Sequence, residues 1–469
     1  MVEKVIQKTD LDNKNFYQKS FKNIIGWSDK ILDYIDEDGY SKASLSYKPY
    51  KPHWIRDSSF TALALLKSAD IIKNKDFLKS CEFENKNDFK IAFQKAKEYE
   101  DYASKIIKFN IEVYNNFKPN IKNFLDSSFE NLKYNVLNYN IPARVGKDRS
   151  FYKDENTDDS KYADSYSGLV QNDTVPLILI SLEKKMETIG LDQYELKFLK
   201  DNSREIFDFL KKSIRVQSSN AWELRGDMQH SYDIAAIYKS MDSLVKISRR
   251  YDIGFNHYEI TDLLNSERFG NPLYYMRKLF VDSEILYACR KPFSEQPSKE
   301  DSVDMSELIV FTLFEINDEK LKTKNVEYNT INLIEKELFG GRFLAKRFKG
   351  DSYFFGGRWI LSAAEKGLYL IDKGKLKEAK EILEKLEYSY NNGWYNIDEY
   401  IINKKGEYSK NTFPEQIIYD PESPEKEDND YFKNNKESVI QDLMWSYADV
   451  VRFNASLVES LLFKDKIRN

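Results

Sequence analysis

The chain has 469 residues, 41% hydrophobic and 32% charged, which excludes an intrinsically disordered protein and allows a large core. Its 72 Lys and Arg against 77 Asp and Glu give a net charge of −5 with both signs interleaved, which excludes the basic surface of a nucleic-acid-binding protein. Two cysteines without a CxxC spacing and three scattered histidines argue against a disulfide framework or a metal centre, and no cofactor is expected.

The N-terminal residues 1–20 lack the apolar segment of a signal peptide. No later run approaches the length of about 18 apolar residues that a membrane span needs. We therefore expect a cytoplasmic protein that binds neither membrane nor nucleic acid, and the sequence does not determine its oligomeric state.

Apolar residues recur at helical spacing along the whole chain, and roughly twelve to fourteen helices are expected. Sustained alternation typical of strands is scarce, so the sequence predicts an all-α fold. The clearest helical stretches are residues 15–35, 58–75, 88–117, 175–189, 194–213, 232–251, 306–316, 357–374, 375–392 and 440–462.

Two kinds of predicted helix alternate. Residues 60–66, 175–182 and 358–370 are apolar nearly all round, as buried helices are, whereas residues 194–212 and 375–387 carry a broad charged face. Such alternation suggests helix pairs wound into a ring or a solenoid. A repeat period of about 34 or 40 residues is not visible, which disfavours a short-repeat solenoid.

Long segments without helical periodicity separate the pairs, at residues 142–168, 290–303 and 406–437. Loops of this length in a compact domain are usually functional or disordered. None resembles a linker, so we expect residues 1–469 to form a single domain.

Polar side chains stand just before several apolar helices. Arg56 and Asp57 precede the first; they are either an ion pair with Asp57 or Ser58 as helix cap, or a group that grips vicinal hydroxyls of a sugar. Gln171 and Asp173 precede a second helix.

Another group of polar and aromatic residues stands before a third apolar helix. A glutamate, Glu415, lies in a loop before a fourth apolar helix. If these helices line the centre of a ring, their ends converge on one polar, aromatic-lined site. The group before the third helix comprises Arg347, Asp351, Tyr353 and Trp359.

Glu223 allows two interpretations. It is either part of an ordinary helix start, three residues after a cap at Asn220, or a carboxylic acid kept protonated by its neighbours Trp222 and Leu224. Glu415, by contrast, has the polar neighbours Gln416, Tyr419 and Asp420, which would keep it ionised. Two carboxyl groups in different environments suit glycoside hydrolysis.

Five segments in chain order, from about Tyr50 to Arg452, resemble glycoside hydrolase family 15, the glucoamylases and their relatives. The first, YKPHWIRDSSF, is similar to an aromatic-x-x-x-W-x-R-D-S motif, and AWELRGDMQHS is similar to the prokaryotic W-E-x-R-G segment. The other three are KRFKGDSYFFGGRWIL, FPEQIIYD and QDLMWSYADVV.

The resemblance implies an (α/α)6 toroid of six inner and six outer helices, and an inverting, exo-acting hydrolase that releases β-glucose from non-reducing ends. It implies Glu223 as general acid and Glu415 as general base, with Tyr50 near the attacking water and the developing charge. Arg56 and Asp57 would hold the terminal glucose, Arg347 would contact hydroxyls around the scissile bond, and the stacking walls would be Trp54, Trp222 and Trp359.

One departure from the family concerns Leu224, since fungal glucoamylases carry a second glutamate there. Comparison with the family also leads us to expect neither a separate β-sandwich domain nor a starch-binding domain. The expected substrates are therefore soluble α-glucans, such as malto-oligosaccharides or glycogen ends. An α-1,6-glucosidase, a trehalase, a toroidal disaccharide phosphorylase and a non-catalytic glycan-binding relative remain alternatives. Glu415 argues against the phosphorylase, which needs no second carboxylate, and retention of both carboxylates argues against the non-catalytic relative.

Overall fold

The computed structural model forms, within its described residues, seventeen α-helices, one π-helical turn at Glu335–Phe339 and six strands of two residues each. The α-helices outnumber the roughly twelve to fourteen expected from periodicity because short helices also lie in the connections. The described residues are 2–46, 50–83, 86–132, 141–150, 171–218, 221–222, 228–266, 270–279, 284–290, 303–316, 318–351, 357–394, 411–417, 440 and 442–468.

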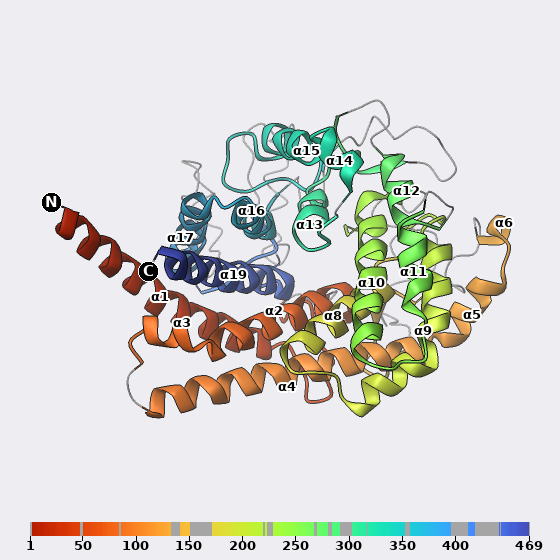
Figure 1. The fold of residues 1–469 in the computed structure, drawn as a ribbon, viewed down its shortest axis with the longest axis horizontal. Helices are drawn as coiled ribbons and strands as arrows, with labels where there is room; N and C mark the ends of the chain where they lie inside the picture. Colours follow the sequence, from red (N-terminus) through yellow and green to blue (C-terminus); the bar gives the residue numbers. More distant parts are fainter. Residues whose placement is uncertain are drawn as a thin grey trace, which may run out of the picture.

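The contacts between helices define an inner ring of six, whose members can be followed in Figure 1. Each packs against the next one along the chain, and the last packs against the first, so the two ends of the polypeptide meet. In order they are α2 (Ile55–Lys73), α8 (Thr174–Thr188), α10 (Ser231–Arg250), α13 (Ser306–Thr312), α16 (Ile360–Asp372) and α19 (Met444–Arg468).

Further helices surround this ring. The α4 helix packs on α2 and α8, and α17 packs on α16 and α19, while ion pairs Lys366–Glu335 and Lys373–Glu327 join α16 to the segment of α15 and its π-turn. The outer helices are α1 (Val2–Leu32), α4 (Lys86–Asn116), α9 (Gln193–Ser213), α11 (His257–Leu264) with α12 (Pro272–Arg277), α15 (Val326–Ile334) and α17 (Leu376–Asn392). The predicted toroid of inner and outer helices is confirmed.

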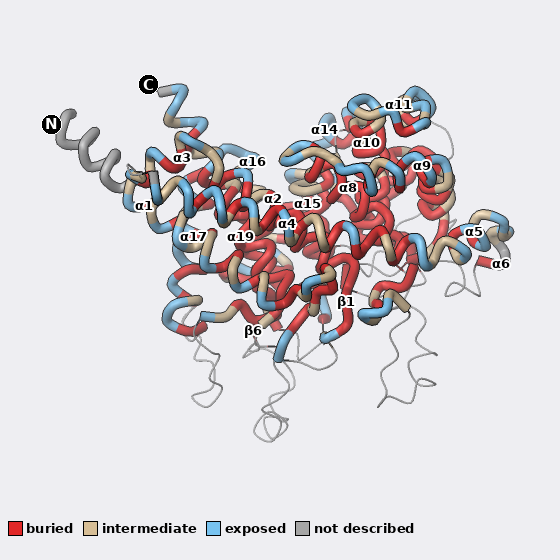
Figure 2. The backbone as a smooth tube through the Cα atoms, turned by 90° about the horizontal axis from the view of Figure 1, so that it is seen from below, coloured by how far each residue is buried: buried red, intermediate tan, exposed pale blue. Residues whose placement is uncertain are grey.

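Sequence patterns explain the difference between the two layers. The inner helices α2 and α8 are buried over almost their whole length, whereas the outer α9 buries one stripe and begins with a capping box between Asp192 and Glu195. Close approach also matters in the ring: a Cβ at Gly367 of α16 would collide with the ring of Phe453 in α19. Figure 2 shows the buried residues gathered in the centre of the molecule.

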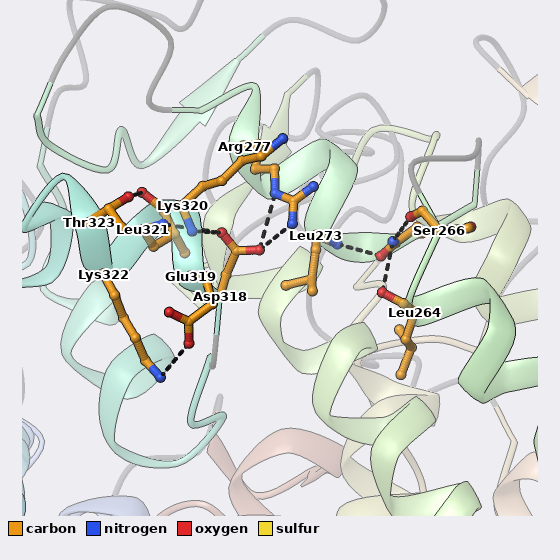
Figure 3. Close-up of polar contacts among 11 residues, drawn as sticks. Leu264, Ser266, Leu273, Arg277, Asp318, Glu319, Lys320, Leu321, Lys322 and Thr323 are labelled. Atoms are coloured by element: carbon orange, nitrogen blue, oxygen red, sulfur yellow. Dashed lines mark hydrogen bonds and ion pairs between the residues drawn. The ribbon is translucent and has the colours of Figure 1, made fainter.

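Side-chain caps fix the short outer helices (Figure 3). Asp318 accepts hydrogen bonds from the backbone N–H groups of Lys320 and Leu321, which begins α14 (Glu319–Thr323), and its second oxygen accepts from the Arg277 guanidinium of α12. Asn271 caps α12 by accepting from the Leu273 N–H at 2.9 Å. These bonds tie the two helices to each other on the outside of the ring.

Among the described helices, none combines the length and the low charge content that crossing a membrane would require.

Candidate active site

Three strand pairs lie at the beginnings of inner helices. β1 (His53–Trp54) runs directly into α2 and pairs with β2 (Arg144–Val145); β3 (Gln229–His230) runs into α10 and pairs with β4 (Cys289–Arg290). β5 (Arg358–Trp359) runs into α16 and pairs with β6 (Gln416–Ile417), the strand that follows Glu415. Figure 2 shows β1 and β6 on the same side of the molecule.

This arrangement corrects the predicted cap of α2. The helix begins at Ile55, so Asp57 is its third residue, and its N-cap position is Trp54 without a side-chain cap bond. The Ile55 N–H instead donates to the Ala143 carbonyl at 3.1 Å, which continues the β1–β2 pairing. Neither Asp57 nor Ser58 caps this helix: the Ser58 hydroxyl donates to the Ile55 carbonyl at 2.9 Å, and Asp57 pairs with Arg56.

Tyr50 and Glu415 meet although 365 residues separate them. The Tyr50 hydroxyl donates to Oε1 of Glu415 at 2.9 Å, and the Tyr50 ring lies 6.0 Å from that of Trp54. Glu415 is only 2% exposed, so its surroundings are more enclosed than the polar loop expected from sequence. The hydrogen bond from Tyr50 fixes the position of one carboxylate oxygen, and a general base must be held within reach of the proton that it accepts.

The backbone around Glu415 is fixed on two sides. Its carbonyl accepts from the Ile360 N–H at the start of α16, at 3.4 Å, and its N–H donates to the Ile440 carbonyl at 3.1 Å. In the β5–β6 register, Trp359 stands opposite Gln416, the neighbour of Glu415. The base candidate therefore lies beside the beginning of one inner helix.

A tryptophan cluster adjoins this strand pair. Trp222 lies 5.4 Å from Trp359 and 5.8 Å from Trp445, measured between ring centroids. The Arg347 guanidinium lies 4.8 Å from the Trp359 ring and 5.9 Å from that of Trp222, and Asp351 holds it through two bonds of 2.7 and 2.8 Å. A rigid cation against aromatic faces can offer donors to hydroxyl groups without having to become ordered first.

Trp222 is anchored by a buried carboxyl group. Its Nε1–H donates to Oδ1 of Asp304 at 2.6 Å, and the Ser306 N–H donates to the same oxygen at 2.7 Å. Burial raises the pKa of Asp304 to about 6, although both of these bonds act in the opposite direction. No local sequence pattern indicates this contact, because Asp304 lies 82 residues from Trp222.

Arg56 connects the Trp54 side of the site with the tryptophan cluster. Its guanidinium lies 6.0 Å from the Trp54 ring and 5.0 Å from the Trp445 ring, and its Nε lies 3.3 Å from Oδ1 of Asp57. Both members of this ion pair are buried. Burial raises the pKa of Asp57, and the neighbouring Arg56 charge opposes that rise.

Trp445 is a member of the cluster that sequence reasoning did not assign. It is the second residue of α19, and Trp54 and Trp359 occupy the positions just before α2 and α16. A tryptophan at the start of an apolar helix was thus the signal that could have identified it.

Two further buried acids, Asp173 and Asp233, lie at the beginnings of α8 and α10. Burial raises the pKa of Asp173 to about 6 and that of Asp233 well above its usual range, while the Arg56 charge lowers both. Asp173 was predicted at a helix start and Asp233 was not singled out. The positive charge of Arg56 therefore lowers the pKa of three buried carboxyl groups, those of Asp57, Asp173 and Asp233, against the effect of burial.

Eight of the nine predicted site residues thus lie in one connected group of contacts: Tyr50, Trp54, Arg56, Asp57, Trp222, Arg347, Trp359 and Glu415. Glu223 lies outside the described residues, as do Asn220, Leu224, Tyr353, Tyr419 and Asp420. The next described helix along the chain is α10, which begins at Ser231. Within the described residues, no three His, Cys, Asp or Glu side chains are grouped as metal ligands.

Comparison with solved structures finds the same architecture. A glycosidase variant in complex with glucose superimposes with a TM-score of 0.64 at 16% identity, covering 95% of this chain and 97% of that one. The glucoamylase of Saccharomycopsis fibuligera gives 0.53 at 14% identity (98% and 96%), and the family 15 glucoamylase of Hypocrea jecorina gives 0.53 at 11% identity (96% and 72%). The chain therefore has the toroidal fold of the glucoamylases. No protein-family model matches the sequence, and no curated protein does.

Proposed function

We propose that the chain is an inverting, exo-acting α-glucoside hydrolase of the glucoamylase type, formed by residues 1–469 as a single catalytic domain. It would release β-glucose from the non-reducing ends of soluble α-glucans or malto-oligosaccharides. The observation that carries the proposal is the Tyr50–Glu415 hydrogen bond beside a cluster of tryptophan and arginine side chains. The glucoamylase-like fold supports it independently.

In this proposal Glu415 is the general base. A general base must be positioned to accept a proton from water, and the Tyr50 hydroxyl holds Oε1 of Glu415 in place through a hydrogen bond. As proton transfer from water to Glu415 proceeds, the same hydroxyl lies next to the developing positive charge on the sugar. Tyr50 is thereby proposed to act in the reaction through both the base and the sugar.

Glu223 is proposed as the general acid. It follows Trp222 directly in the chain, and Trp222 packs against Trp359, whose strand partner is next to Glu415. These contacts support a place for the two glutamates in the same site, and the proposal puts them on opposite sides of one sugar. Inverting enzymes hold such carboxyl groups about 6.5–9.5 Å apart, which leaves room for the attacking water.

The remaining residues would bind the sugar. Arg56 and Asp57 offer rigid donors and a carboxylate to the hydroxyls of the terminal glucose, and Arg347 offers donors near the scissile bond. Tryptophan faces suit the apolar faces of sugar rings. The walls are proposed to be Trp54, Trp222 and Trp359, joined by Trp445.

The stereochemistry of the product tests the proposal. Proton NMR in the first minutes of maltotriose hydrolysis should show β-glucose, with α-glucose appearing only as mutarotation proceeds. A panel of maltose, isomaltose, trehalose and glycogen then assigns the linkage, including the α-1,6 and trehalose alternatives. Initial release of α-glucose would contradict the pairing of Glu223 with Glu415.

Two amide substitutions test the roles. Glu223→Gln and Glu415→Gln should each lower kcat by at least about 10²-fold, because an amide neither donates the proton nor accepts it. Glu378→Gln is the matched control, since Glu378 is exposed on α17 and contacts only the exposed Lys375 among the ion pairs of the described residues. Near-normal kcat in folded Glu223→Gln protein would remove the acid assignment.

A further inference from the structure

The loop that carries Tyr50 and the strand that follows Glu415 share one anchor, Asp442. Asp442 lies two residues before α19, between the backbone groups that hold the Glu415 segment. On one side, the Glu415 N–H donates to the Ile440 carbonyl at 3.1 Å, and the Leu443 N–H donates to the Phe413 carbonyl at 3.0 Å. The Glu415 segment is thereby fixed to the residues immediately around Asp442.

On the other side, the Asp442 carboxylate accepts hydrogen bonds from residues that precede Tyr50 in the chain. Its Oδ1 accepts from the Ser44 hydroxyl at 2.8 Å, from the Ser46 N–H at 3.3 Å and from the Ser46 hydroxyl. Its Oδ2 accepts from the Tyr34 hydroxyl at 3.1 Å. Four donors from one short stretch of chain therefore converge on a single carboxylate.

The loop itself is closed onto Tyr50. The Ser44 N–H donates to the Tyr50 carbonyl at 3.1 Å, and the Met444 N–H donates to the Ala43 carbonyl at 2.9 Å. The hydrogen bonds thus form a closed path from Tyr50 through Ser44 to Asp442, on through residue 440 to Glu415, and back to Tyr50 through the phenol–carboxylate bond of 2.9 Å.

We propose that Asp442 is a positioning residue that sets the distance between the Tyr50 hydroxyl and the Glu415 carboxylate. The inference rests on the proposed function, because it deepens the assignment of Tyr50 and Glu415. Asp442 acts through the loop and not on the substrate. Active-site groups displaced by about 1 Å can lose about 10²-fold in rate, so fixing this distance has a catalytic consequence.

Asp442→Ala removes all four accepted bonds. We expect kcat to fall up to about tenfold, no further than removal of the Tyr50 hydroxyl itself would lower it, while KM changes less than about threefold, since the residues proposed to bind glucose are untouched. Asp442→Asn should restore kcat to within about threefold of wild type, because its amide oxygen can accept from the serines and its amide N–H can donate to the Tyr34 hydroxyl.

Asp465→Ala is the matched control. Asp465 lies near the other end of the same helix and accepts from the Tyr17 hydroxyl at 2.7 Å, so this variant loses a similar phenol–carboxylate bond far from Glu415. Its kcat should equal that of wild type. If Asp442→Ala and Asp465→Ala lower kcat equally, the role of Asp442 is only structural and the proposed positioning role is contradicted.

A double-mutant cycle separates this inference from the proposed function. If Asp442 acts through Tyr50, adding Tyr50→Phe to Asp442→Ala should lower kcat less than about threefold further, whereas independent roles would multiply. The same cycle can be measured on the folding equilibrium constant, which needs no enzymatic activity. The factor by which this constant falls in the double variant should be at least about threefold smaller than the product of the factors for the two single variants.

Each result decides one question. If wild type hydrolyses none of the glucosides, the proposed function fails, and the unfolding cycle still decides whether Asp442 and Tyr50 are coupled. Multiplicative effects in the cycle overturn the inference even in an active enzyme. If Asp442→Ala does not fold, Ser44→Ala removes one donor and must show the same non-multiplicative behaviour with Tyr50→Phe.

Discussion

Removal of the Tyr50 hydroxyl is the most direct test of the candidate site. Tyr50→Phe deletes one oxygen, the donor to Glu415 at 2.9 Å, and keeps the ring that packs 6.0 Å from Trp54. A hydrogen bond to a charged group contributes about 1.5–3 kcal/mol net. Since about 1.4 kcal/mol corresponds to a tenfold change in rate, the full range is about 10- to 150-fold.

Partial exposure of Tyr50 places the expected loss in kcat near the lower end, about tenfold. The assay is steady-state hydrolysis of maltotriose, with the melting temperature measured in parallel. Tyr99→Phe is the matched control, because the Tyr99 hydroxyl donates to Oδ1 of Asp29 at 2.8 Å between the outer helices α4 and α1. An unchanged kcat in Tyr50→Phe would refute the coupling of this hydroxyl to catalysis.

Three further outcomes are expected. Asp57→Asn should lower kcat/KM for maltotriose about 10- to 100-fold, because a charged hydrogen bond to the sugar is lost. If a folded protein with alanine at both Arg56 and Asp57 remains fully active, these two residues form only a structural ion pair. Trp445→Phe keeps most of the packing and should lower kcat/KM about two- to tenfold, as expected for one aromatic contact, and an unchanged value would place Trp445 outside the site. Burial lowers the pKa of His53 from 6.5 to about 4, so the stability that its neutral form contributes is present above pH 6.5 and is lost as the pH falls to about 4. The loss should reach about 3 kcal/mol in urea unfolding curves, and the persistence of that slope in His53→Gln would assign it to other groups.

The apolar pattern predicted helix pairs wound into a ring or a solenoid because it depends on how much of each helix is buried, and the closed toroid was implied by the family resemblance. An inner helix is covered on all sides and an outer one on a single side, so the two layers differ in composition, as α8 and α9 do. The strand pairs were not predicted, because two residues are too few to show alternation. They nevertheless decide where α2 and α16 begin, which is why the expected cap at Asp57 was wrong.

The site was predictable where chemistry is local and not where it depends on distant partners. Arg56 with Asp57, and Arg347 with Asp351, are close in sequence and are ion pairs in the structure. The contacts of Trp222 with Asp304 and of Tyr50 with Glu415 join segments 82 and 365 residues apart, and only the closed ring brings them together. No local pattern in one sequence encodes such pairs.

Ring closure also has a consequence for how the protein is made. Tyr50 leaves the ribosome early and Glu415 late; at about 5–20 residues per second, roughly 20 to 70 seconds of translation separate them. During that interval the growing arc has no α19, and the face of α2 that later packs against α19 has no covering helix. Such an arc presents apolar surface to chaperones and to neighbouring nascent chains. Because the base candidate and its phenol partner come from opposite ends of the polypeptide, an interrupted chain would hold neither half of the pair in place, and the appearance of activity would mark the moment at which the last helix docks.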